Sequence, residues 1–64
     1  MKTFLYNAQD EPNPIEMTEE QILSEYWAWW SMSMANKFGS NSDLITKQNC
    51  IEDWVVVHWA WEKK

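Results

Sequence analysis

The chain has 64 residues, enough for one domain, and a domain this small hides a smaller share of its surface on folding than a larger one. Its one cysteine cannot form an internal disulfide, so the packing of ten aromatic side chains, six of them tryptophan, has to stabilise the fold. Ten acidic residues against five lysines give a net charge of -5, which repels nucleic-acid phosphates and anionic membranes. This composition argues against direct binding of nucleic acid or of a membrane.

The sequence also predicts a cytoplasmic location. The first residues contain only three consecutive apolar side chains, too few for the core of a signal peptide, and no run approaches the length of a membrane span. A lone Cys50 without an export signal is typical of a cytoplasmic chain.

Two short strands are predicted at the N-terminus. Residues 3–7 alternate weakly and are rich in aromatic and β-compatible side chains, and the turn-forming cluster 8–14 follows them. Residues 15–17 are predicted to return as a short antiparallel strand. The two prolines lie in the connection, where a missing N–H donor does no harm.

A long helix is predicted to follow, over residues 19–38. Thr18 and Gln21 form a capping box, in which each side chain accepts from the other residue's backbone N–H, and the two glutamates between them lie at the positive end of the helix dipole. Gly39 provides the matching stop, because glycine readily adopts the left-handed conformation that ends a helix.

The helical period divides the apolar residues of this segment into two sets. With about 3.6 residues per turn, one set falls on a single stripe that is predicted to face the core: Leu23, Tyr26, Trp27, Trp30, Met34 and Phe38. The other set is displaced from that stripe and is expected at the surface: Ile22, Trp29 and Met32.

The last third of the chain contains competing signals. Thr46, or Ser42 before it, can cap a second helix, whereas the three consecutive valines and the tryptophans of residues 54–61 favour a strand. We predict a helix over residues 47–57 that passes into a short strand over 59–62, paired with 4–6; a helix continuing to Trp61 is the alternative. The predicted fold is thus α+β, with a small antiparallel sheet of three strands packed against two helices.

No residue pattern points to catalysis, a metal or a cofactor. In a helix, Cys50 and His58 would lie roughly 12 Å apart, too far for a nucleophile and its base. His58 and Glu62 are spaced as two ligands on one helical face, but a structural zinc site needs about four. Residues 49–62 are therefore interpreted as a core-forming segment, and the protein is expected not to be an enzyme.

Residues 49–62 also carry a resemblance. This stretch is similar to the C-terminal end of small proteins encoded by tailed bacteriophages, cyanophages among them, and the opening at 1–3 and the stretch at 25–27 resemble them too. The resemblance implies a context in which small acidic phage proteins bind a host enzyme and alter it by occupying a surface. It transfers no catalytic or binding residue to this chain.

The surplus of tryptophan leads to the functional prediction. Tryptophan is enriched at interface hot spots, and an exposed apolar patch on an acidic domain is typical of a partner site. We predict a non-enzymatic protein that binds a bacterial host protein and modulates or inhibits it through Ile22, Trp29, Met32 and the adjacent Glu25. Two alternatives remain open: a homodimeric assembly module that uses the same patch, and an acidic mimic of nucleic acid.

Overall fold

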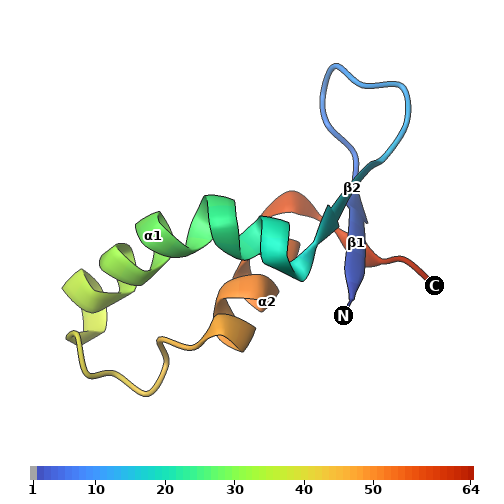
Figure 1. The fold of residues 1–64 in the computed structure, drawn as a ribbon. Coiled ribbons are helices and arrows are strands. Elements are labelled where there is room, and N and C mark those ends of the chain that lie inside the picture. Colours follow the sequence, from blue (N-terminus) through green and yellow to red (C-terminus); the bar gives the residue numbers. More distant parts are fainter. Residues whose placement is uncertain (1) are drawn as a thin grey trace.

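A computed structural model, which describes residues 2–64, has two helices and one antiparallel sheet (Figure 1). The predicted α+β fold is confirmed, with the sheet packed on the two helices. In chain order, the elements are β1 (Thr3–Tyr6), β2 (Ile15–Thr18), α1 (Glu19–Phe38), α2 (Lys47–His58) and β3 (Trp61–Glu62).

The N-terminal strand β1 is the centre of the sheet, whose strand order is β2-β1-β3. Phe4 pairs with Met17 and Leu5 pairs with Trp61, so strand alternation places Phe4 and Met17 on one face and Leu5 and Trp61 on the other. The first face packs on the helices, where Phe4 and Met17 are buried. On the face of Leu5, an ion pair between Lys63 and Glu16 connects the chain end that follows β3 to β2.

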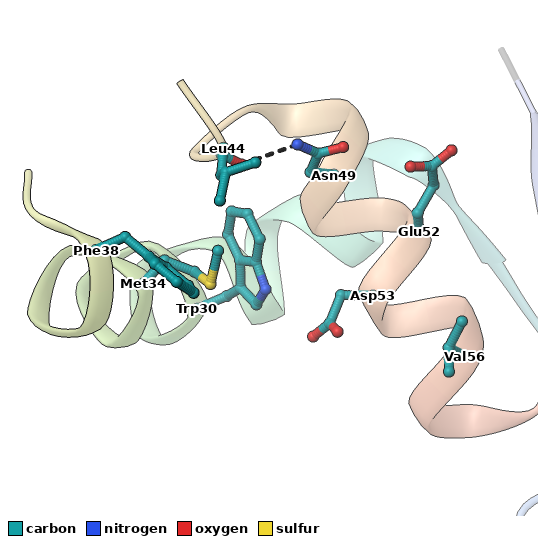
Figure 2. Close-up of a pocket in the computed structure, with 8 residues that line it drawn as sticks. All are labelled: Trp30, Met34, Phe38, Leu44, Asn49, Glu52, Asp53 and Val56. Atoms are coloured by element: carbon teal, nitrogen blue, oxygen red, sulfur yellow. Dashed lines mark hydrogen bonds between the residues drawn. The ribbon is translucent and has the colours of Figure 1, made fainter. Parts of the chain in front are cut away.

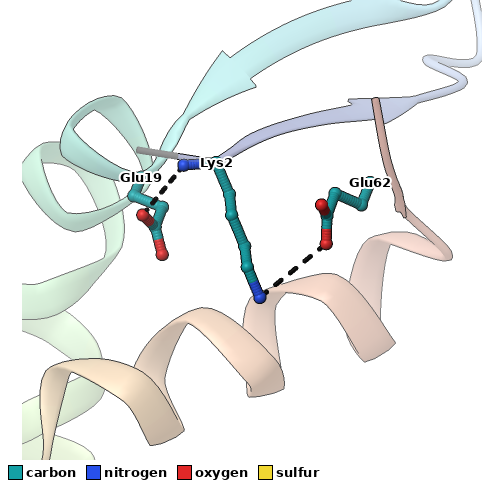
Figure 3. A network of polar contacts seen from close by, with 3 residues as sticks. All are labelled: Lys2, Glu19 and Glu62. Carbon is teal, nitrogen blue, oxygen red and sulfur yellow. Dashed lines mark hydrogen bonds and ion pairs between the residues drawn. The ribbon is translucent and has the colours of Figure 1, made fainter. Parts of the chain in front are cut away.

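Lys2 joins the start of the chain to two other elements (Figure 3). Its backbone N–H donates to Oε1 of Glu19 at 3.1 Å, and its Nζ lies 3.7 Å from Oε1 of Glu62. These contacts connect the beginning of β1 to the first turn of α1 and to β3. Because the pair with Glu62 is largely exposed, it contributes roughly 1 kcal/mol or less to stability.

The ends of α1 follow the local signals in the sequence. The capping box is present, with the backbone N–H of Gln21 donating to the Thr18 hydroxyl at 3.2 Å and that of Thr18 donating to Oε1 of Gln21 at 2.9 Å. Gly39 ends the helix with a positive φ of 93°, and its N–H donates to the carbonyl of Ala35 at 2.9 Å. The ψ of Gly39, 149°, lies outside the left-handed helical region, so the predicted left-handed helical conformation is not adopted.

The core lies where the sheet, α2 and the first half of α1 meet. It contains Phe4, Met17, Ile22, Ile51 and Trp54, with Tyr6, Leu23, Tyr26, Val55 and Ala60 packed around them. The ring of Trp54 meets Tyr6 edge to face, with ring centroids 5.3 Å apart, and stacks on His58 at 4.4 Å. Aromatic contacts of this kind add to the stabilisation that burial itself gives a small core.

Two predictions about the faces of α1 are wrong. Ile22 is completely buried, whereas Phe38 is 54 % exposed. The reason is tertiary: β2 leads directly into α1 and directs its first turn into the core, but the second half of α1 extends away from the sheet and α2 (Figure 1). Helical periodicity places side chains around a helix, but it does not say how far along the helix a covering element reaches.

The change from helix to strand in the last third of the chain is confirmed, and the alternative of a helix continuing to Trp61 is wrong. Thr46 caps α2 by accepting from the N–H of Asn49 at 3.1 Å. The helix ends at Trp59, a non-glycine residue in the left-handed conformation (φ 55°, ψ 37°), so β3 begins two residues later than predicted. Trp59 as a whole residue is 88 % exposed.

Backbone strain at Trp59 gives the first testable prediction. A left-handed non-glycine residue costs roughly 1 to 2 kcal/mol, and glycine avoids this cost while losing somewhat more entropy on folding. We expect Trp59→Gly to be more stable than Trp59→Ala by about 0.5 to 1 kcal/mol in urea unfolding. Trp59→Ala is the matched control, because it removes the exposed ring and keeps the strain. Equal stability of the two variants would contradict this assignment.

Candidate partner-binding groove

A groove runs between the second half of α1 and one side of α2 (Figure 2). It forms because α1 continues beyond the core and α2 does not accompany it. The groove encloses about 440 Å³, and eight residues line it: Trp30, Met34, Phe38, Leu44, Asn49, Glu52, Asp53 and Val56. We refer to this feature as the α1–α2 groove.

The α1 wall of the groove consists of Trp30, Met34 and Phe38. These residues are four positions apart, so their side chains lie one above another along the helix. Trp30 is buried at the inner end, Met34 is half-buried, and Phe38 is exposed at the outer end. The exposure of the wall therefore increases with distance from the core.

The opposite wall combines α2 with the connection that precedes it. Leu44 is held over one end of the groove, because its carbonyl accepts from Nδ2 of Asn49 at 2.9 Å and its N–H donates to the Ser42 hydroxyl at 3.2 Å (Figure 2). Val56 contributes the largest apolar exposure of this wall, at 73 %. Local hydrogen bonds thus position the loop side of the groove before any partner is present.

Acidic residues occupy the α2 side of the groove. Figure 2 shows the Asp53 side chain pointing into the space between the helices and Glu52 extending from the outer side of α2. Oδ2 of Asp53 accepts from the Tyr26 hydroxyl at 3.0 Å, which ties α1 to α2. Burial and this hydrogen bond raise the pKa of Tyr26 to about 12. In residues 2–64, the ion pairs are Lys2 with Glu62 and Lys63 with Glu16, so neither groove carboxylate is paired with a lysine.

The residues that the sequence singles out as a partner site are divided by the structure. Glu25, Trp29 and Met32 are exposed and share one face of α1 at i, i+4 and i+7, with Trp29 62 % and Met32 68 % exposed. Ile22 is buried, so its assignment to the surface patch is wrong. By helical spacing, the face of Trp29 and Met32 points away from the α1–α2 groove, and its contact with a partner stays a prediction.

The groove is not predicted by the sequence, because the helical stripe places Phe38 in the core and the pattern of residues 54–61 fits both a helix and a strand at Val56. One signal could have revealed Val56. Successive residues of a helix point about 100° apart, so three consecutive valines on a short helix cannot all face the core. The structure bears this out: Val55 packs on the core, and Val56 and Val57 are exposed.

Cys50 and His58 are part of the packing of α2. Cys50 is completely buried, and burial, reinforced by the nearby Asp53 charge, raises the pKa of its thiol to about 11. His58 lies against Trp54, with Nδ1 2.9 Å from the Trp54 carbonyl oxygen. Within residues 2–64, no group of three or more His, Cys, Asp or Glu side chains could hold a metal ion.

Comparisons with protein-family models, curated proteins and solved structures found no match to this chain. None of the helices formed by residues 2–64 has the length and apolar character needed to cross a membrane.

The burial of Ile22 gives the second prediction. Ile22→Val removes one methyl group from a fully buried side chain and should lower the free energy of unfolding by about 1 kcal/mol. Met32→Ala, on the exposed face of the same helix, should change it by no more than about 0.5 kcal/mol. Urea unfolding monitored by circular dichroism measures both free energies. A larger loss of stability for Met32→Ala than for Ile22→Val would contradict the burial of Ile22.

Alkaline unfolding gives the third prediction. The pKa of Cys50 is raised from 9.0 to about 11 and that of Tyr26 from 10.0 to about 12, largely because both groups are removed from water. Since the folded pKa values are the higher ones, both groups contribute stability that is present below pH 9.0 and is lost as the pH rises towards about 12. Tyr26→Phe should lose less stability than the unsubstituted protein in urea unfolding above pH 10.0. Parallel pH curves would contradict the assignment to Tyr26.

Proposed function

We propose that this protein is a non-enzymatic binding module that holds an apolar segment of another protein in the α1–α2 groove. The observation that carries the proposal is the groove itself, a concave and mainly apolar surface between two helices on a chain with a net charge of -5. Concave apolar sites with a few polar groups are the usual form of binding sites, and anchor residues of a partner bind best in such pockets.

The large exposed area of the chain supports the proposal that a partner covers part of its surface. A monomer of 7.7 kDa has an expected accessible surface of about 4,300 Å². This chain exposes 4937 Å², an excess of the same order as the roughly 800 Å² that each partner buries in a standard interface. Part of the excess belongs to the polar loop at 7–14, which water solvates, but the second half of α1 presents apolar side chains.

The shape of the molecule agrees with its area. The radius of gyration is 12.7 Å, against about 10.7 Å for a compact domain of this length. The projecting half of α1 contributes to this extension, and it forms one wall of the groove (Figure 1). A partner segment in the groove would cover Phe38 and Val56 and complete the packing that this half of α1 lacks.

The groove is a better candidate than the outer face of α1. Trp29 and Met32 lie on a single helix surface, which contacts a partner from one side only. A segment in the groove is contacted by α1, by α2 and by Leu44, and so loses more apolar area to the protein. The outer face, with Trp29 and Met32, is the second candidate contact surface.

The proposed partner is a bacterial host protein, and the proposed effect is modulation or inhibition in the host cytoplasm. The resemblance of residues 49–62 to small tailed-phage proteins supports this part of the proposal. Binding that only occupies a surface requires no catalytic group, which agrees with the packing roles of Cys50 and His58.

A pull-down from bacterial lysate with two matched variants is the fourth prediction. Val56→Asp places a charge in the groove, and Met32→Asp places the same charge at a similarly exposed position outside it. We expect the unsubstituted protein and Met32→Asp to retain one specific partner that Val56→Asp loses, because a buried carboxylate opposes apolar contact.

Circular dichroism of both variants checks that the fold is kept. Loss of the partner by Met32→Asp alone would move the site to the outer face of α1. Recovery of no specific partner by the unsubstituted protein would count against a binding function.

A further inference from the structure

We infer that the segment held in the α1–α2 groove is an amphipathic helix with a lysine or arginine beside its apolar face. This inference rests on the proposed function and adds the class of partner segment to it. Three features of the groove lead to this inference: the backbone groups of its walls are already hydrogen-bonded, its side chains have helical spacing, and its charge is negative.

The walls of the groove offer no backbone partner to a bound segment. The walls are formed by two helices, whose N–H and C=O groups are bonded within α1 and α2 except near their ends, and by Leu44, whose N–H and carbonyl are bonded to Ser42 and Asn49. In the part of the chain that the structure describes, the edge strands are β2 and β3, and neither lines the groove. A segment that enters an apolar groove has to satisfy its own backbone groups, and a helix does so internally.

The spacing of the lining residues fits a third helix. Trp30, Met34 and Phe38 form a ridge along α1 at intervals of four residues. Ridges of this spacing pack into the grooves between the side chains of another helix. The ridge is about 12 Å long, so two or three turns of a partner helix would cover it.

The charge of the groove selects a basic partner. Asp53 points into the groove, has no lysine partner in residues 2–64, and keeps one oxygen available because Tyr26 bonds to Oδ2. Glu52, also without a lysine partner there, extends from the outer side of α2 at the edge of the groove (Figure 2). The net charge of -5 repels acidic segments in general. A lysine or arginine on the flank of the bound helix would meet the Asp53 carboxylate, and the charges of Glu52 and Asp53 would steer its approach.

Three fluorescein-labelled peptides test this inference. Each has about 15 residues with leucines at i, i+3, i+4 and i+7, and the remaining positions are lysine, glutamine or glutamate. Fluorescence anisotropy should show the lysine peptide binding roughly 3- to 10-fold more tightly than the glutamine peptide in about 0.05 M salt, and the glutamate peptide binding least. The ratio should approach one in about 0.5 M salt, where exposed charges are screened.

Three variants locate the binding. Val56→Asp should abolish binding of both the lysine and the glutamine peptide, whereas Met32→Asp adds the same charge outside the groove and should leave both affinities unchanged. Glu52→Gln combined with Asp53→Asn should make the lysine and glutamine peptides bind equally. The affinity of the glutamine peptide itself should not change.

Each contrary result has a distinct meaning. Equal binding of the lysine and glutamine peptides to the unsubstituted protein would overturn the basic class and leave the proposed function standing. If no peptide binds at up to about 0.5 mM protein, the helical segment is wrong. The proposed function is tested separately by the pull-down, and it fails if no specific partner is recovered or if Val56→Asp retains the same partner. Self-association in sedimentation velocity that Val56→Asp abolishes would assign the groove to a second copy of the chain and overturn both proposals.

Discussion

One small core at one end of α1 determines the rest of this structure. Ile22 of α1, Trp54 of α2 and Phe4 of β1 belong to the same buried cluster, and no other buried cluster extends along α1 in residues 2–64. The other elements are short: three strands of four residues or fewer and a helix of twelve residues. They cannot cover a helix of 20 residues along its whole length, so the second half of α1 projects and the α1–α2 groove follows from the lengths of the elements.

Features that depend on neighbouring residues could be predicted from the sequence. The capping box at Thr18, the stop at Gly39 and the passage from α2 into a strand rest on local chemistry, and the structure confirms them. The exchange of roles between Ile22 and Phe38 could not be predicted in the same way. Both residues are apolar members of one helix, and their burial depends on which part of the helix meets the sheet and α2.

The same distinction explains what could be predicted of the candidate site. The period of α1 correctly places Trp29 and Met32 at the surface, because no other element covers that side of the helix at these two positions. The groove requires the relative position of two helices and a loop, and its residues are distributed from Trp30 to Val56 along the chain. Periodicity assigned Phe38 to the core for a sound reason: it lies on the apolar stripe. The helical period does not show how far along α1 a second element covers that stripe.

The strained residue Trp59, at the end of α2, lies on an apolar surface that is continuous with the α1–α2 groove. Val56 lines the groove and also a second hollow of about 390 Å³, which Val55, Trp59 and Ala60 complete. The apolar surface therefore continues from the groove around the end of α2 to Trp59. Folding alone favours glycine at this left-handed position, and the exposed ring of Trp59 gives the monomer little burial in return for the strain. In the proposed complex, a partner helix longer than the ridge of α1 would extend over Val56 and contact this ring, which accounts for a strained tryptophan at the surface.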